Sequence, residues 1–431
     1  MAMRVEPLPY RVGQISTGTL LLIVVLLGVV AQGLYAFSRQ LTEGLVVTGM
    51  RDIGTMGGPA WGLYIAFDIY FVGVSFAGIT TAALVRLLNL HALRAVSRLA
   101  EVLTIIALIL AAFSVLPDLG QPLRGVVHLL KYARPQSPFF GTFTMVIAGY
   151  LFASLVYFFL DGRRDAAICA ARAGRLQWFY RLWAAGYRDT PAERERHRRV
   201  GFWLSLAILP MLVIAHSTLG FVFGLQVGRP GWFSALQAPA FVIMAGVSGV
   251  GLLIIIAAIV RTTLEAQDRL TPEVFRWLAN FLMVLTAAYI YFMLVDWLTA
   301  TYAAPLHESR VTSALLFGPY ARIYWPSVAA LVAAFYLLLR QFLTGRYSIA
   351  VTVLCGALVN VAAVGKRLLI VVPSQTHGAM LPYPSGTYTP TWVEYSIIGG
   401  LIALGTLLYI VFTKVFPVIE LPEARQEMGH R

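Results

Sequence analysis

The chain has 431 residues, of which 59% are hydrophobic and only 12% are charged, and its formal net charge is +13. This composition excludes a water-soluble globular protein, because the apolar residues gather in long runs that fill most of the sequence. The positive charge lies mainly in short loops between those runs, so it indicates orientation in a membrane rather than a nucleic-acid partner.

Ten apolar runs are long enough to cross a bilayer, which takes about 20 residues of helix. Because backbone groups in lipid must form hydrogen bonds within their own segment, we predict an all-α integral membrane protein with ten transmembrane helices. In chain order the predicted helices are 17–37, 60–84, 99–115, 140–160, 200–223, 233–260, 275–300, 324–340, 349–371 and 395–416. The first run is too long for the core of a cleavable signal peptide, so we interpret it as an anchor.

Lysine and arginine are unevenly divided between the two sides of these helices. About two thirds of the 33 lie in the termini and in the loops after the second, fourth, sixth and eighth helices. The positive-inside rule places this side in the cytoplasm, so both termini are predicted to be cytoplasmic. The loops 38–58, 116–139, 224–232, 301–323 and 372–394 then face outward.

The most basic loop, 162–199, separates the first four helices from the last six. Within it, residues 165–187 interleave apolar side chains with arginines, and four apolar side chains lie roughly on one helical face: Trp178, Phe179, Leu182 and Trp183. That pattern is typical of a helix lying on an anionic leaflet. A charged loop that only sets topology and a docking surface for a cytoplasmic partner are the alternatives.

Charged side chains inside the predicted helices are costly in lipid, so each is a functional candidate. Asp68 lies nine residues into the second helix, about 14 Å below its outer end. His216 lies in the outer third of the fifth helix. Glu101 is near the inner end of the third helix, where pairing with Arg98 or Arg94 is the structural alternative. Further candidates on the outer side are Asp118, Arg124 and His128 after the third helix, Asp296 in the seventh, and Lys366 and Arg367 in the ninth, whose long side chains are expected to reach the interface.

Redox cofactors within the chain are not expected. A membrane cytochrome b needs pairs of axial histidines at depth, and His216 is the one histidine well inside a predicted helix. The two cysteines, Cys169 and Cys355, are too few for a four-cysteine iron–sulfur site. The sequence also contains no P-loop, HExxH, GxSxG or CxxC pattern. We therefore predict no haem, no iron–sulfur cluster and no metal site, and an integral subunit with acid–base groups in its outer half.

Six short segments stand at helix ends and loops in a characteristic order: WGLYIAFDIYFVG at 61–73, DLGQPLR at 118–124, SPFFGT at 137–142, QAPAFVI at 237–243, LLFGPY at 315–320 and YTPTWVE at 388–394. Together they resemble the NrfD-like, polysulfide-reductase-type membrane subunits, and the last resembles the ten-helix branch of that family. The resemblance covers nearly the whole chain.

This resemblance implies two four-helix bundles, formed by the predicted helices 2–5 and 6–9, with helices 1 and 10 flanking them. The corresponding division of the chain is 1–58, 59–224, 225–371 and 372–431. It also implies a menaquinone or ubiquinone bound near the outer face, in the cytoplasmic membrane of a prokaryote. The expected partners are a ferredoxin-like iron–sulfur subunit on the outer side and, beyond it, a molybdopterin oxidoreductase or a multihaem cytochrome.

A quinone needs an apolar slot, a polar contact at each carbonyl and a group that exchanges protons. We assign His216 as carbonyl contact and proton exchanger, with Asp68 and Asp118 orienting it or relaying protons. Arg124 is expected to hold a carboxylate such as Asp118, or to face the docked subunit. His128, Tyr64 and Tyr150 complete the expected binding residues, and Glu101, Asp68 and Asp296 the expected proton path.

A secondary transporter or proton channel without quinone chemistry is the alternative. Transporters often contain helices broken at the midplane, and Pro210, Gly220 and the glycine-rich run 246–251 are candidate break points. Small residues also permit close packing of helices, which is the simpler interpretation. Co-purification of a quinone with an iron–sulfur subunit separates the two functions.

Overall fold

The computed structural model describes residues 8, 10–50, 59–88, 90, 93–132, 134, 136, 144–172, 174, 176–302, 306–377, 386 and 388–421. The SPFFGT segment at 137–142 therefore lies outside the described residues. The α-helices are α1 Thr17–Glu43, α2 Leu63–Val74, α3 Phe76–Leu87, α4 Arg94–Asp118, α5 Pro122–Tyr132, α6 Thr144–Ala171, α7 Gln177–Ala184, α8 Pro191–Gly224, α9 Gln237–Thr263, α10 Pro272–Tyr302, α11 Leu306–Leu316, α12 Ala321–Thr344, α13 Ile349–Val371, α14 Pro373–Thr376 and α15 Trp392–Val415.

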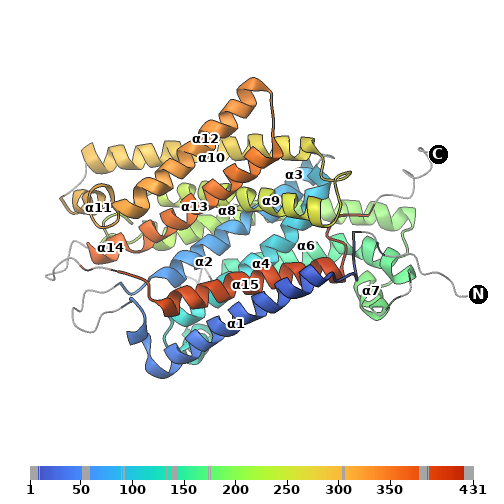
Figure 1. Cartoon of the computed structure of the whole chain (residues 1–431), viewed down its shortest axis with the longest axis horizontal. Helices are drawn as coiled ribbons and strands as arrows, with labels where there is room; N and C mark the ends of the chain where they lie inside the picture. The colour runs from blue at the N-terminus through green and yellow to red at the C-terminus, as the bar shows by residue number, and fades with distance from the viewer. Residues whose placement is uncertain are drawn as a thin grey trace, which may run out of the picture.

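Ten segments of the described chain are long and apolar enough to cross a membrane, which confirms the predicted fold class. Eight are the single helices α1, α4, α6, α8, α9, α10, α12 and α15. The other two are the pair α2 and α3, which covers Leu63–Leu87, and α13 with α14, which covers Ile349–Thr376. The short helices α5, α7 and α11 connect these segments at the two ends of the molecule (Figure 1).

The helices are divided here into two groups, and α2, α3 and α8 also contact α9 across this division. In the first group, α4 contacts α2, α3 and α6, and α8 contacts α3 and α6. The second group is a closed ring of four helices, in the order α9, α10, α12 and α13. The packing of α8 and α2 on α9 joins the groups, and α15 packs on α4 and carries α1 on its other side (Figure 1). We call the end of the molecule with α7 and both described chain ends the inner end, and the end with α11 and α14 the outer end.

The second predicted helix, 60–84, is divided at Ser75 into α2 and α3. The Ser75 hydroxyl donates to the carbonyl of Val72 at 2.6 Å, so it competes with the regular helical hydrogen bonds at this point. By contrast, α8 runs unbroken through Pro210 and α9 through 246–251, so the proposed break points there are wrong. A Cβ at Gly220 would lie 2.7 Å from Ala238 Cα, which shows that this glycine serves close packing of α8 on α9.

The basic loop is shorter than predicted, because α6 continues to Ala171 and α8 already begins at Pro191. Thr190 and Glu193 form a capping box that starts α8 at this position. The segment 165–187, for which one helix was expected, is therefore divided between the end of α6 and α7. Its Trp183 stacks on Phe416 at 4.2 Å between ring centroids, while Trp178 and Leu182 are exposed. The contact of that exposed face with a leaflet stays a prediction.

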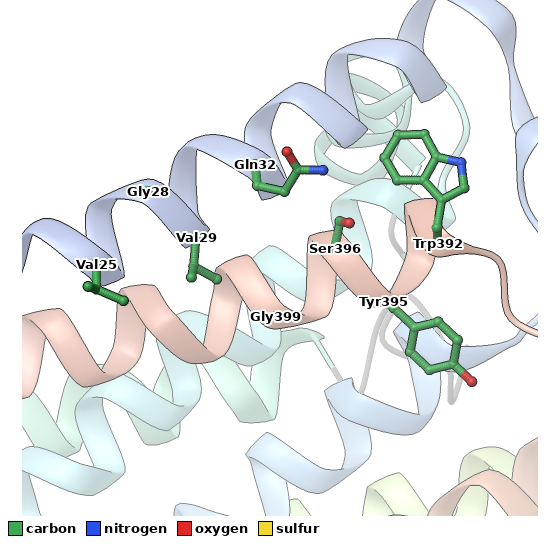
Figure 2. Close-up of a pocket in the computed structure, with 8 residues that line it drawn as sticks. All are labelled: Val25, Gly28, Val29, Gln32, Trp392, Tyr395, Ser396 and Gly399. Carbon is green, nitrogen blue, oxygen red and sulfur yellow. The ribbon is translucent and has the colours of Figure 1, made fainter. Parts of the chain in front are cut away.

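Helices α1 and α15 lie side by side along most of their length, at the edge of the molecule (Figure 1). A Cβ at Gly33 would lie 2.9 Å from the carbonyl oxygen of Ser396 and 3.0 Å from Gly400 Cα, so only glycine permits this approach. A shallow groove of about 530 Å³ runs along the pair between Gly28 and Gly399, with Trp392 and Tyr395 at one end (Figure 2).

Candidate functional site

A group of polar side chains lies where the outer ends of α1, α2 and α4 meet. The Tyr64 hydroxyl donates to Gln40 Oε1 at 2.6 Å, and Gln40 Nε2 donates to the carbonyl of Pro117 at 2.6 Å. Asp118 follows Pro117 directly, and Asp68 lies one helical turn after Tyr64 on α2. We call these four side chains, Gln40, Tyr64, Asp68 and Asp118, the outer polar cluster.

Asp68 is the least compensated member of the outer polar cluster. It is 5% exposed, and the nearby charge that acts on it is that of another carboxyl group, Asp118. Within the described part of the chain, the Asp68 carboxyl group has no salt bridge and no hydrogen bond to another side chain or to the backbone. A buried carboxyl group without a cation is costly, so Asp68 is suited to binding a polar ligand group or a proton.

Helix α15 adds a second buried carboxyl group next to this cluster, which the sequence analysis did not assign to the site. Glu394 is fully buried and accepts hydrogen bonds from the Tyr388 hydroxyl at 2.5 Å and from the Gly49 and Thr391 amides at 2.7 and 2.9 Å. Burial, together with the Glu394 charge, raises the pKa of Tyr388 far above its usual value. The T-x-x-E spacing of Thr391 and Glu394, typical of a capping box, is the sequence signal that marks this residue.

His216 and Tyr150 meet at the break between α2 and α3. The two ring nitrogens of His216 lie 2.8 Å from the Leu212 carbonyl and 2.9 Å from the Val72 carbonyl, and the ring is almost fully buried beside Tyr150. The Tyr150 hydroxyl donates to the carbonyl of Ser75 at 3.0 Å. Both side chains therefore hydrogen-bond backbone carbonyls at or next to the divided helix. The role of His216 as a quinone contact stays a prediction.

The structure does not bring every predicted residue to the cluster. Arg124 and His128 are exposed on α5, where Arg124 donates to Gln121 at 3.3 Å and His128 packs edge-on against Tyr132. Asp296 lies in the second group of helices, on the exposed face of α10, within electrostatic reach of Lys366. These positions separate Asp296 from the carboxyl groups of the first group.

The inner end of the first group holds a different set of charges. Arg98 donates to Asp165 Oδ2 at 2.5 Å and to Asp161 Oδ2 at 3.1 Å, and Arg86 pairs with the other oxygen of Asp161. Arg98 is 1% exposed, so these are buried ion pairs. We call Arg86, Arg98, Asp161 and Asp165 the inner ionic network.

Glu101 lies beside the inner ionic network but is not part of its hydrogen bonding. Its Oε1 accepts from the Ser97 hydroxyl at 3.2 Å, and its buried Oε2 has no hydrogen-bond partner among the described residues. The hydrogen bonds of the Arg98 guanidinium go instead to the two aspartates and to the carbonyl of Pro417. Glu420 approaches the same charges from the segment after α15, and burial and Asp161 raise its pKa to about 7.

Arg367 corrects one expectation about the ninth predicted helix. Its side chain does not reach the interface but is 2% exposed inside the molecule, with its guanidinium 4.3 Å from the centre of the Phe241 ring. Lys366 lies over the ring of Tyr324 at 5.2 Å. The ring of Phe241 on α9 thus holds the Arg367 cation inside the molecule, whereas Lys366 is half-buried and its predicted reach toward the interface stays a prediction.

The chain is similar to a known protein family and to several named proteins over most of its length. The model of the family described as "Polysulphide reductase, NrfD" matches residues 52–379. The chain is 29% identical to a putative dimethyl sulfoxide reductase membrane subunit of Halobacterium salinarum, over 96% of this chain and 94% of the relative. It is 26% identical to a selenate reductase subunit of Mesobacillus selenatarsenatis, over 90% and 91% of the two chains. It is 23% identical to the Hdr-like menaquinol oxidoreductase integral membrane subunit of Archaeoglobus fulgidus, over 92% and 93%. The resemblance found in the sequence is confirmed, and the chain belongs to the NrfD family of integral membrane subunits.

Proposed function

We propose that this protein is the quinone-binding membrane subunit of a respiratory oxidoreductase, and that it exchanges electrons between the membrane quinone pool and an iron–sulfur subunit at the outer face. The family supports the membrane-subunit role, and the name of the Archaeoglobus relative supports menaquinol as the class of substrate. The observation that carries the site is Asp68, a buried carboxyl group at the outer end of the first group of helices that has no cationic partner among the described residues.

The residues of the outer polar cluster fit a quinone head group. A bound quinone supplies two-electron chemistry coupled to two protons. The Asp68 carboxyl group hydrogen-bonds the head group and exchanges a proton with it, and Asp118 carries that proton toward the outer surface. Tyr64 is held by Gln40, so it fixes the wall of the site and the position of α2 on α1.

His216 takes a positioning role in this proposal. Both of its nitrogens lie against backbone carbonyls, so a direct contact with a quinone requires that one of these interactions be replaced. Through the Val72 carbonyl, His216 fixes the end of α2 one turn after Asp68, and thereby the direction in which Asp68 points. Tyr150 does the same through Ser75.

The test is Asp68→Asn in the whole complex, which keeps the size of the side chain and removes the exchangeable charge. We expect quinol-linked turnover to fall about 100-fold or more, the range of a lost general acid–base group, while the amounts of assembled complex and of bound quinone stay close to wild type. Asp189→Asn on the inner surface is the matched control, because Asp189 is exposed and far along the chain from the cluster. Unchanged turnover in assembled Asp68→Asn would remove Asp68 from the site.

The partner assignment is tested by purification. An iron–sulfur subunit, together with a molybdopterin enzyme or a multihaem cytochrome, is expected to co-purify with the chain. If the chain purifies without any redox subunit or quinone and instead moves a solute or protons alone, the transporter alternative replaces the proposal.

Proton translocation is a separate part of the proposal. Glu101 and Asp68 lie on α4 and α2 at different depths of the first group, and Asp296 lies in the second group. A path between them needs internal water, because a hydrogen bond does not span such separations. Proteoliposomes of the whole complex with an internal pH dye test it. Equal pH changes during turnover in wild type and Glu101→Gln would exclude a role for Glu101.

A further inference from the structure

A cavity of about 830 Å³ opens at the inner end of the molecule, and its lining extends to Phe71, three residues after Asp68 on α2. Its walls come from α1, α2, α4, α9 and α15, and the side chains that line its depth are apolar, such as Leu103, Leu110, Ile256 and Ile402. Its volume lies in the range of ligand sites, about 300–1,000 Å³. A space of this kind in a membrane protein takes an elongated apolar ligand.

The mouth of the cavity is polar and positively charged. Arg11, Gln14, Ser16, Thr263 and Lys414 line this end. Arg11 pairs with Glu265 and donates to the carbonyl of Thr263 at 3.3 Å. Lys414 is partly buried, lies within electrostatic reach of Arg11, and has no acidic partner among the residues that the structure describes. Two neighbouring cations that share one carboxylate favour an anionic group at this position.

The depth of the cavity matches one leaflet. On α15 the lining residues extend from Lys414 at the mouth to Ile402, which is about 18 Å along the helix axis. Half of the hydrocarbon core of a bilayer is about 15 Å thick. An acyl chain that enters from the inner end therefore fills the cavity to its far wall.

Hydrogen bonding in the depth of the cavity argues against a quinone there. A quinone carbonyl needs a donor, but the Tyr70 hydroxyl already donates to Asn360 Oδ1 at 2.8 Å and the Tyr409 hydroxyl to the Leu99 carbonyl at 3.1 Å. The Thr406 hydroxyl donates to the Ile402 carbonyl at 2.9 Å. The deep wall thus offers an apolar surface, and the charge is at the mouth.

We propose that this cavity binds one anionic phospholipid of the inner leaflet, with its acyl chains between α1, α9 and α15 and its phosphate on Lys414 and Arg11. The lipid contacts helices of both groups, because α4 and α9 both line the cavity. The polar contacts of this lipid, Arg11 and Lys414, lie at the other end of the molecule from Asp68, so the failure of this proposal and the failure of the proposed function are distinguishable.

Two matched pairs of variants in the whole complex test the proposal. Thr406→Trp fills the cavity, and Thr299→Trp is its control, because Thr299 is also exposed on its helix and bonds the carbonyl four residues earlier. Lys414→Gln removes the cation that has no acidic partner among the described residues, and Arg340→Gln removes an exposed cation at the same end of the molecule. After purification in mild detergent, mass spectrometry of extracted lipid measures phospholipid and quinone per complex.

We expect one phospholipid fewer per complex in Thr406→Trp and the wild-type number in Thr299→Trp. In phosphatidylcholine nanodiscs, added phosphatidylglycerol should raise the Tm of wild type, and Lys414→Gln should need about fivefold more of it, the equivalent of about 1 kcal/mol per basic residue. Equal phospholipid retention in Thr406→Trp and wild type, or loss of a quinone in its place, would overturn the proposal. So would an equal response of wild type and Lys414→Gln to phosphatidylglycerol.

Discussion

The two ends of the first helix group both bury carboxyl groups, but in opposite surroundings. At the inner end, Asp161 and Asp165 are each bonded to the guanidinium of Arg98. At the outer end, Asp68 has Asp118 as its charged neighbour. A carboxylate held by arginine keeps its charge and fixes the packing, whereas one without a cation is free to exchange protons. Depth in the membrane therefore does not distinguish a structural from a functional carboxyl group; its partner does.

The orientation of the two ends in the membrane is the first thing to test, and cysteine labelling gives an all-or-none result. Both native cysteines are buried, so a background that lacks them allows single new cysteines. Gly386→Cys should react with an impermeant maleimide in intact cells, and Ala192→Cys, which is exposed beside the start of α8, only after permeabilisation. The reverse pattern would exchange the inner and outer ends.

The largest effect on stability is expected from the inner ionic network. Arg98→Met leaves Asp161 and Asp165 buried without this guanidinium, and a broken buried ion pair costs about 3–5 kcal/mol. The free energy of unfolding in detergent, or the amount of complex in membranes if it does not assemble, measures the loss. Arg276→Met, which removes an exposed salt bridge with Glu273, is the control and should change little. A stable Arg98→Met would show that the network is dispensable.

An intermediate effect is expected at the helix break. His216→Leu removes the ring nitrogens that lie against the Val72 and Leu212 carbonyls, and the loss of such a hydrogen bond costs about 0.5–1.5 kcal/mol. Quinol-linked turnover should fall while the complex still assembles. Tyr150→Phe removes a donor at the same break. Equal loss of turnover in both variants would show that the helix break positions Asp68. Loss of turnover in His216→Leu alone would show that His216 contacts the quinone. Full turnover in His216→Leu would exclude both roles.

The smallest effect is the pH dependence that Glu420 contributes. Its pKa in the folded protein is raised to about 7, above the value of an unfolded glutamate. The folded state therefore binds the proton more tightly, so this contribution to stability is fully present below about pH 4 and is lost as the pH rises through 7. Glu420→Gln should flatten the Tm profile between pH 5 and 8, by about 2 °C or more. A profile that is unchanged in Glu420→Gln would show that other groups dominate.

The sequence predicted the membrane helices well, because a run of about 20 apolar residues in lipid leaves the backbone few alternatives. The sequence did not predict where a helix is divided, because local hydrogen bonds of side chains to the backbone determine such a break. Ser75 divides the second helix by donating to Val72, whereas Pro210, the stronger helix breaker in isolation, lies inside the continuous α8. Packing against neighbouring helices determines whether a helix is divided or continuous, and the residues of one segment do not reveal that packing.

The spatial arrangement of the candidate site was anticipated in part, and the roles of its residues stay predictions. Tyr64, Asp68 and Asp118 come together as expected from their positions near the outer ends of neighbouring helices. Gln40 and Glu394 were missed, since α1 and α15 were expected to flank the bundles rather than to supply polar groups. Arg98 was considered as a partner of Glu101, but Asp161 and Asp165, which lie within α6, bind it instead. Pairing between helices depends on their relative rotation, which hydropathy does not specify.

The close contact of Gly33 with Gly400 has a consequence for biosynthesis. The two glycines are about 370 residues apart, which corresponds to roughly 20–70 s of translation at 5–20 residues per second. During that interval α1, whose apolar window is 11% buried even in the finished fold, waits in the bilayer for the last described helix. The glycine face of α1 is thus open to competing transmembrane helices until α15 is inserted, and the insertion of α15 covers this face.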